Sequence, residues 1–114
     1  MDNSATISSD SDFGKRFSQI KKHDALMLLH EGKNIPITEK ITIGRDPDNI
    51  ISLDDCMVSR RHALVQRIKE AFFIADLNSS NGTFVNGKEI PKGKYFKLTK
   101  GDAIKIGRTE IIIQ

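Results

Sequence analysis

The sequence predicts an all-β protein, an antiparallel β-sandwich that follows a weakly ordered N-terminal tail. Short segments with the alternating pattern of a β-strand recur about every eight to ten residues from residue 25 onward. Turn residues separate these segments, and no convincing amphipathic helix interrupts them. Many short strands with regularly spaced turn signals are typical of a sandwich.

The first 24 residues differ from the rest in composition. "MDNSATISSDSDFG" is rich in serine and aspartate, and in the following "KRFSQIKK" four of the eight residues are basic. Low hydrophobicity without a sustained period predicts a disordered or weakly ordered tail. We therefore divide the chain into a tail, residues 1–24, and one domain, residues 25–114.

Within the domain, ten segments have the pattern of a strand: 25–30, 34–38, 40–44, 62–68, 71–77, 82–85, 88–90, 95–98, 103–107 and 109–114. Asn86-Gly87 predicts a two-residue hairpin turn, because both positions tolerate positive φ. "EGK", residues 31–33, predicts a second tight turn. "RDPDN", residues 45–49, has the composition of a type I turn and leads from a strand into a polar loop.

Composition limits the function classes. The 114 residues suffice for one domain with a modest core, and the single cysteine, Cys56, cannot form an internal disulfide. No Cys/His cluster has zinc spacing, so we expect neither a metal nor a cofactor. Ala25–Leu29, the longest apolar run near the N-terminus, is too short for a signal peptide or a membrane span. We expect a cytoplasmic protein without a membrane partner, and the net charge of +3 favours anionic ligands.

Three polar segments lie between the predicted strands. The first contains Arg45, the second is Ser59–His62, and the third is Asn78–Gly82. Taken singly, each residue has an ordinary structural interpretation as a turn former or a solvated surface group. In a sandwich, however, alternate loops gather at one end, so we expect these guanidinium, hydroxyl, amide and backbone N–H donors to face one spot. Such a set of donors suits a dianionic phosphate group.

These segments resemble the three signature blocks of the forkhead-associated (FHA) domain, in the same order and at ordinary spacing. The matching stretches are "GR" at Gly44–Arg45, "SRRH" at Ser59–His62 and "NSSNGTFVNG" at Asn78–Gly87. The resemblance covers residues 25–114. It implies an eleven-stranded antiparallel β-sandwich of the FHA/SMAD type that binds phosphothreonine peptides and catalyses no reaction. It also implies that both termini lie opposite the binding loops.

Carried over residue by residue, the resemblance implies a phosphothreonine-binding role for Arg45, Ser59, Arg60, Ser80 and Asn81. Arg45 would contact the phosphate, and the hydroxyl of Ser59 would hydrogen-bond to it. Ser80, where the family often has threonine, would donate near the phosphate or the threonine methyl group. Asn81 would hold the peptide backbone through its two-sided amide. Arg60 would contribute a backbone N–H.

Other residues are expected to support the site or to select the peptide. Gly44, His62, Asp76 and Gly82 would support the binding loops. In the family, some members use an arginine two residues before the signature serine to favour aspartate at the third position after the phosphothreonine. Here that position is Met57, so we expect an aliphatic preference. The expected partner is a protein phosphorylated by a Ser/Thr kinase, which makes the chain a signalling adaptor.

Two rival functions and one regulatory hypothesis remain open from the sequence. A hydrolase would use Ser59, His62 and Asp76, but no G-x-S-x-G nucleophile elbow is present. A nucleic-acid-binding domain is suggested by the basic run in the tail, but the chain lacks an aromatic platform, so nucleic acid is not the expected partner.

Thr6 is the only threonine in the tail, and after phosphorylation the tail could bind to its own domain. The alternative is a linker without a switching role.

Overall fold

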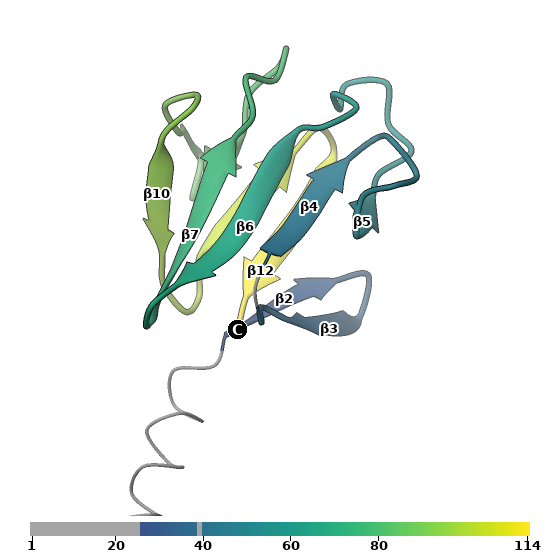
Figure 1. The fold of residues 1–114 in the computed structure, drawn as a ribbon. Coiled ribbons are helices and arrows are strands. Elements are labelled where there is room, and N and C mark those ends of the chain that lie inside the picture. The colour runs from purple at the N-terminus through teal and green to yellow at the C-terminus, as the bar shows by residue number, and fades with distance from the viewer. Residues whose placement is uncertain (1–25, 39) are drawn as a thin grey trace, which may run out of the picture.

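A computed structural model describes residues 26–38 and 40–114 (Figure 1). The described part of the chain contains eleven strands: β2 (Met27–His30), β3 (Lys33–Pro36), β4 (Lys40–Gly44), β5 (Ile51–Ser52), β6 (Ala63–Ile68), β7 (Ala71–Asp76), β8 (Phe84–Val85), β9 (Lys88–Glu89), β10 (Tyr95–Leu98), β11 (Ala103–Ile106) and β12 (Thr109–Ile113). The predicted eleven-stranded β-sandwich is confirmed. The predicted tail, residues 1–24, lies outside the described residues.

The strands form two sheets. The five-stranded sheet has the order β10-β7-β6-β4-β5, and the six-stranded sheet has the order β3-β2-β12-β11-β8-β9. Every pairing is antiparallel except that of β4 with β5, which is parallel and joins Ile43 to Ile51. The sheet containing β5 is therefore mixed rather than purely antiparallel, and β5 was not among the segments predicted from the pattern. A two-residue strand is too short to show alternation.

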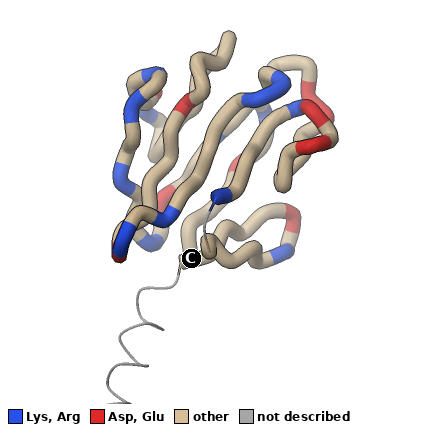
Figure 2. The backbone as a smooth tube through the Cα atoms, viewed as in Figure 1, with Lys and Arg blue, Asp and Glu red and all other residues tan. Residues whose placement is uncertain are grey.

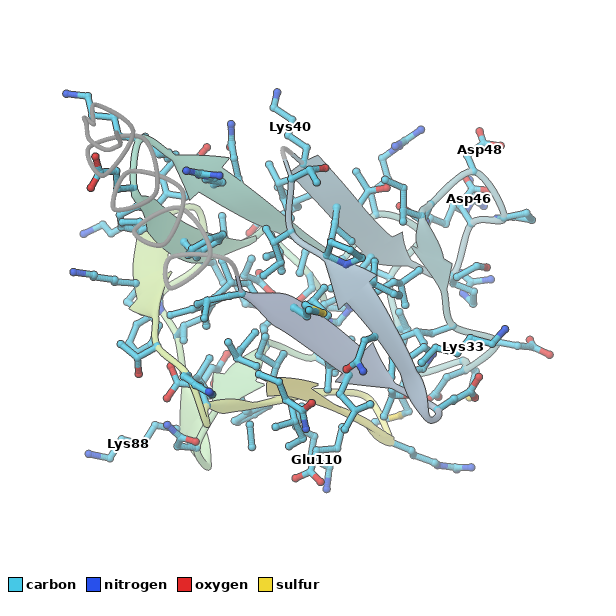
Figure 3. The ribbon with its side chains drawn as sticks, turned by 90° about the horizontal axis from the view of Figure 1, so that it is seen from below. Lys33, Lys40, Asp46, Asp48, Lys88 and Glu110 are labelled. Carbon is cyan, nitrogen blue, oxygen red and sulfur yellow. The ribbon has the colours of Figure 1, made fainter. Side chains whose placement is uncertain are left out.

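The core lies between the two sheets and follows the alternation of the strands. In β11, Ile104 and Ile106 are fully buried while Lys105 is exposed; in β12, Ile111 and Ile113 are fully buried. Side chains of alternate residues leave opposite faces of a sheet, so each strand supplies one apolar face to the core. Figure 3 shows the sandwich from below, with the labelled charged side chains pointing outward around its periphery.

The predicted turns are present. Asn86 and Gly87 have φ of 52° and 84° and join β8 to β9, whereas Glu31 and Gly32 have φ of 51° and 76° and join β2 to β3. Positive φ at both central residues is the type I′ arrangement, which matches the twist of the flanking strands. The N–H of Asn49 donates to the carbonyl of Asp46 at 3.1 Å and closes the turn that contains Pro47.

Three loops gather at one end of the sandwich, seen at the top of Figure 1. They follow β4 (residues 45–50), precede β6 (residues 53–62) and connect β7 to β8 (residues 77–83). The C-terminus lies at the other end, where Met27 and Gln114 exchange two backbone hydrogen bonds of 2.8 Å. The start of the described domain and its C-terminus therefore lie away from the loops that carry the candidate site.

Candidate functional site

The three loops surround a hollow of about 240 Å³. The lining residues are Arg45, Cys56, Met57, Val58, Ser59, Arg60, Ser80 and Asn81. A larger hollow of about 580 Å³ lies beside it, and Cys56 lines both. Three carboxylates, Glu31, Asp54 and Asp55, line the larger hollow against one guanidinium, that of Arg108, so the excess negative charge would repel an anion. The smaller hollow is therefore the better candidate for a phosphate.

Arg45 enters the hollow directly after the end of β4. Its backbone N–H donates to the carbonyl of Ser59 at 2.9 Å, and its Nε donates to the carbonyl of Val58 at 3.0 Å. Among the described residues, neither Nη group of Arg45 forms a hydrogen bond. The Nε bond fixes the plane of the guanidinium. The two Nη groups remain available to bind an anion with two parallel hydrogen bonds.

Ser59 is oriented by its neighbours on both sides. Its backbone N–H donates to Nδ1 of His62 at 3.1 Å, and its Oγ accepts the backbone N–H of Ser80 at 3.1 Å. A hydroxyl that accepts one bond still has its own proton to donate. The Ser59 hydroxyl can therefore donate to a ligand in the hollow while its oxygen remains tied to the loop between β7 and β8.

Asn81 connects that loop to the loop before β6. Its Nδ2 donates to the carbonyl of Met57 at 2.8 Å, and the residue is exposed. An amide has two N–H donors and one oxygen acceptor, so one N–H and the Oδ1 remain for a ligand. A donor and an acceptor side by side suit the backbone of an extended peptide.

Arg60 presents a different set of groups. Its carbonyl accepts the backbone N–H of Asp46 at 3.2 Å and Nδ2 of Asn49 at 2.8 Å. Its backbone N–H makes no hydrogen bond to another described residue, and its side chain is exposed. The residue thus has one backbone donor and one guanidinium to offer at the edge of the hollow.

His62 lies behind the hollow, fully buried directly before β6. Because Nδ1 accepts the Ser59 N–H, the proton of a neutral ring is on Nε2, which lies 2.8 Å from the carbonyl of Gly82. The backbone N–H of His62 donates to Ile43, and its carbonyl accepts the N–H of Leu77. One residue therefore holds the second and third loops together.

Asp76 ends β7 and organises the third loop. Its buried carboxylate accepts the backbone N–H of Ser79 at 2.8 Å, the Ser79 hydroxyl at 2.6 Å and the Thr83 hydroxyl at 2.6 Å. Burial raises the pKa of this carboxyl, but the hydrogen bonds from Ser79 and Thr83 outweigh it, and the pKa lies below its ordinary value. The carboxylate is therefore charged at neutral pH.

The two supporting glycines allow close approaches. A Cβ on Gly44 would collide with the carbonyl of Arg60 and come within 2.7 Å of Nδ2 of Asn49. Gly82 has a φ of 90°, a conformation that L side chains rarely adopt. Each glycine thus permits a backbone path that a side chain would block or strain.

The structure adds residues that the sequence did not single out. Asn49 is buried, and its Nδ2 donates to the carbonyls of Asp46 and Arg60, both at 2.8 Å, so it joins the first loop to the second. Its position in "RDPDN" predicted a turn but not this second contact. Ser79 and Thr83 act through Asp76, and the sequence has no signal that assigns these two hydroxyls to that carboxylate.

The geometry does not form a hydrolytic triad. His62 faces the backbone N–H of Ser59 rather than its Oγ, and the other ring nitrogen faces the carbonyl of Gly82. Nε2 of His62 and Oδ1 of Asp76 are 3.9 Å apart, beyond a hydrogen bond. A general base must reach the hydroxyl proton of the nucleophile, which this ring does not do.

Figure 2 marks the charged residues along the backbone: Asp and Glu lie among Lys and Arg on the loops around β4 and β5. Within residues 26–38 and 40–114, no group of three or more His, Cys, Asp or Glu side chains is placed to hold a metal ion. The described part of the chain also has no helix long and apolar enough to cross a membrane.

Comparison with known proteins identifies relatives of the same kind. The FHA domain family matches residues 41–107. The oxoglutarate dehydrogenase inhibitor of Corynebacterium jeikeium is 38% identical over 93 residues, which cover 77% of this chain and 62% of that protein. The FHA domain-containing protein FhaA of Mycobacterium tuberculosis is 40% identical over 86 residues, which cover 75% of this chain and 14% of that protein.

The glycogen accumulation regulator GarA of Mycobacterium tuberculosis is 36% identical over 93 residues, which cover 77% of this chain and 56% of that protein. The chain thus spans less than two thirds of the length of these three relatives.

Solved structures agree with the family match. A structure from an analysis of phosphothreonine-dependent FHA domain interactions has a TM-score of 0.70 and 34% identity, and covers 79% of this chain and 95% of its own. Mycobacterium tuberculosis EmbR in complex with a low affinity phosphopeptide has a TM-score of 0.72 and 34% identity, and covers 79% of this chain and 24% of its own. Because the family match at residues 41–107 spans more than half of the chain, and the solved structure covers 79% of it, the chain belongs to the FHA family.

Proposed function

We propose that this domain binds phosphothreonine peptides in the hollow formed by the three loops. The observation that supports it most directly is the convergence of unused donors: both Nη groups of Arg45, the Ser59 hydroxyl and the Asn81 amide face a common space. Solved FHA relatives have been studied for phosphothreonine-dependent interactions and in complex with a phosphopeptide. The same ligand class suits this hollow.

Each donor has a distinct role in this proposal. Arg45 pairs with the charge of the phosphate, and Ser59 donates its hydroxyl proton to a phosphate oxygen. Asn81 holds the peptide backbone through its remaining N–H and its Oδ1. Ser80 and the backbone N–H of Arg60 supply further donors at the edge.

Preference for phosphothreonine over phosphoserine requires more than burial of the extra methyl group. One buried methyl contributes roughly 0.8 kcal/mol, which is about a fourfold difference in affinity. Threonine also restricts its χ1 torsion, so its phosphate is presented in fewer directions. Together these effects give a strong but incomplete preference.

The biological role that follows is recruitment or regulation of a protein phosphorylated by a Ser/Thr kinase. Relatives carry the names of an inhibitor and a regulator, which fits a binding module rather than an enzyme. We propose a cytoplasmic adaptor that needs no cofactor. Self-binding of a phosphorylated tail would involve Thr6, which lies outside the described residues and is treated as a prediction below.

The test begins with an oriented phosphothreonine peptide library screened against the full chain. The tightest peptide is then titrated by calorimetry against the wild type and Arg45→Ala. We expect Arg45→Ala to lose about 2–5 kcal/mol of binding free energy, because the phosphate charge is left partly unpaired. Arg45→Lys should recover little, because an ammonium group cannot form the forked contact.

Arg61→Ala is the matched control, since Arg61 is an exposed arginine of the second loop that does not line the hollow. Unchanged affinity of a folded Arg45→Ala variant would refute the site. If instead the wild type binds random DNA with a steep salt dependence and ignores phosphopeptides, the nucleic-acid alternative is correct.

A further inference from the structure

Residues 57–59 of the second loop have all their backbone hydrogen-bonding groups engaged. Met57 donates to Oδ1 of Asp55 and accepts from Asn81. Val58 donates to the carbonyl of Asp55 and accepts from Nε of Arg45. Ser59 donates to His62 and accepts from the N–H of Arg45. The backbone of residues 57–59 is thus held at every donor and acceptor, and the amides of these three residues are not free to bind phosphate.

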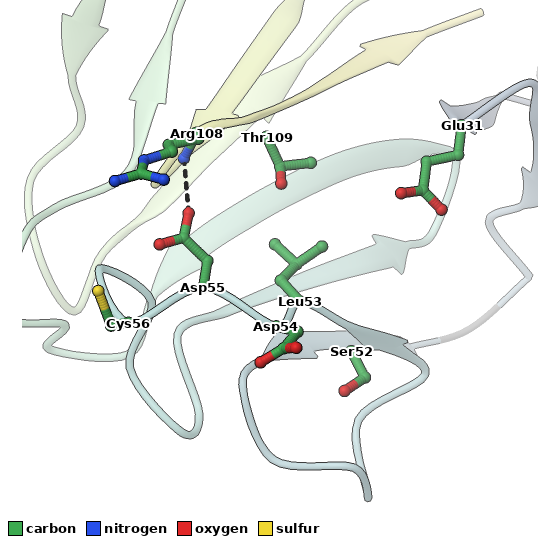
Figure 4. Close-up of a pocket in the computed structure, with 8 residues that line it drawn as sticks. All are labelled: Glu31, Ser52, Leu53, Asp54, Asp55, Cys56, Arg108 and Thr109. Carbon is green, nitrogen blue, oxygen red and sulfur yellow. Dashed lines mark hydrogen bonds between the residues drawn. The ribbon is translucent and has the colours of Figure 1, made fainter.

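Asp55 connects this loop to the opposite sheet. Its Oδ1 accepts the N–H of Met57 at 2.9 Å, and its Oδ2 accepts the N–H of Arg108, in the turn between β11 and β12, also at 2.9 Å. Figure 4 shows the second contact as a dashed line across the space between the two segments. The hydrogen bonds from Met57 and Arg108 lower the pKa of the Asp55 carboxyl, so both oxygens are acceptors at neutral pH.

The turn between β11 and β12 is shaped to receive this carboxylate. Gly107 has a φ of 60°, and a Cβ there would lie 2.6 Å from Oδ2 of Asp55 and 2.8 Å from Cγ2 of Val58. The glycine therefore lets the turn approach both the carboxylate and the buried Val58 side chain. The second loop is therefore held by the turn between β11 and β12 of the six-stranded sheet. Neither these two strands nor their turn contributes a residue to the hollow.

The two atoms that this contact positions are the acceptors of the recognition side chains. The Met57 carbonyl accepts Nδ2 of Asn81, and the Val58 carbonyl accepts Nε of Arg45. If the loop shifts, both acceptors move, and with them the directions in which the amide and the guanidinium face the ligand.

We infer that Asp55 is a positioning residue for phosphopeptide binding, which acts by holding the Met57 and Val58 carbonyls where they orient Asn81 and Arg45. This inference rests on the proposed function. Asp55 itself does not line the hollow, so its effect passes through the loop.

The experiment is a double-mutant cycle on the full chain, with the tightest library peptide as the probe. Asp55→Ala should weaken binding about tenfold, because two hydrogen bonds to a charged group are lost and the loop is released. In the Asn81→Ala background the same change should cost less than about threefold, since one of the two side chains that Asp55 positions is already absent and only the effect through Arg45 remains. A general loss of stability would instead be additive.

Two controls separate positioning from other effects. Asp54→Ala removes the neighbouring exposed carboxylate, which forms no side-chain hydrogen bond to any described residue, and should leave the affinity unchanged. Gly107→Ala should weaken binding about as Asp55→Ala does, because it pushes on the same carboxylate. Gly93→Ala is the control for backbone strain. Gly93 also has a positive φ, of 76°, but a Cβ there would meet nothing within 4 Å, so this change should leave the affinity unchanged.

The outcomes distinguish this inference from the function on which it rests. If the wild type binds no phosphothreonine peptide, the proposed function fails. If the wild type binds but Asp55→Ala is within twofold of it, or if the two losses are additive, Asp55 is not a positioning residue and the function stands. A shift of the Arg45 Nε–H resonance in Asp55→Ala, but not in Asp54→Ala, would support positioning through the Val58 carbonyl.

Discussion

The backbone N–H of Ser59 donates to Nδ1 of His62 at 3.1 Å, three residues further along the chain. This contact uses the main chain of Ser59 and leaves its hydroxyl for the hollow. It also determines the ring tautomer, so that Nε2–H of His62 faces the carbonyl of Gly82. The two loops that carry Ser59 and Ser80 are therefore braced by a buried ring that does not itself line the hollow.

Replacing Ser59 by alanine should separate binding from folding. The backbone contact to His62 survives, whereas the hydroxyl that would donate to the phosphate is lost. We expect a loss of about 1.5–3 kcal/mol in binding free energy, the range for a hydrogen bond to a charged group. Titration calorimetry measures this loss, and an unchanged melting temperature shows that the fold is intact. Wild-type affinity in a folded Ser59→Ala variant would contradict the assignment of the hydroxyl.

Asp76→Asn should reduce stability in a pH-dependent way. The folded-state pKa of Asp76 is below its ordinary value of 3.8, so the charged form contributes stability above that value, and this contribution is lost as pH falls through the folded pKa. At pH 7 we expect Asp76→Asn to lower the free energy of unfolding by about 1.5–3 kcal/mol.

Urea unfolding at pH 7 and at about pH 3 tests this expectation, because the difference between the wild type and Asp76→Asn should shrink at the lower pH. Asp48→Asn is the control, since Asp48 is exposed and points away from the sandwich in Figure 3. A difference that is the same at both pH values would show that the carboxylate charge is not the source of the effect.

Cys56 offers a chemical probe of the hollow. It is the only cysteine of the chain, it is exposed, and it lines the hollow beside Met57. A bound peptide should therefore slow alkylation of the Cys56 thiol by iodoacetamide in proportion to the fraction of protein bound. Mass spectrometry follows the rate, and the unphosphorylated peptide serves as the control. Equal rates with and without saturating phosphopeptide would place the peptide elsewhere.

Met57 should set the preference at the third position after the phosphothreonine. Its side chain lines the hollow and is 44% exposed, and it has no group that would pair with a carboxylate. We expect the wild-type library profile to favour aliphatic residues there and Met57→Arg to favour aspartate. A wild-type profile dominated by aspartate would contradict this prediction.

The tail prediction concerns Thr6, which lies outside the described residues. A flexible chain of the length from Thr6 to Asp24 spans roughly 5–6 Å × √18, or about 23 Å r.m.s.. A domain of this size has a radius of gyration of about 13 Å, so the tail could carry phosphorylated Thr6 to the binding loops of its own domain. Intramolecular binding would raise its effective concentration towards millimolar and exclude competing peptides.

Amide NMR on a chain phosphorylated at Thr6 alone tests this prediction. Self-binding should shift Ser59, Ser80 and Asn81 independently of protein concentration, and Arg45→Ala should abolish the shifts. Identical spectra with and without the phosphate would leave the tail as a linker without a switching role.

The sequence alone was sufficient for the sandwich, for the turns at Glu31-Gly32 and Asn86-Gly87, and for the order of the polar loops. These features depend on local patterns: alternation along a strand, and residues that tolerate positive φ. The strand β5 could not be predicted from the sequence, because two residues show no alternation. Its parallel pairing with β4 depends on how the loop between β4 and β5 returns to the sheet.

Only the tertiary structure shows how the recognition side chains are aimed. Nε of Arg45 bonds to Val58, 13 residues away, Asn49 bonds to Arg60 across 11 residues, and Asp55 bonds to Arg108 across 53 residues. A hydrogen bond between distant segments leaves no periodic mark in the sequence, since it exists only when packing brings a donor and an acceptor to within about 3 Å with suitable alignment. The types of the binding residues can thus be predicted from the chain, whereas their orientation is decided by the packing of two sheets.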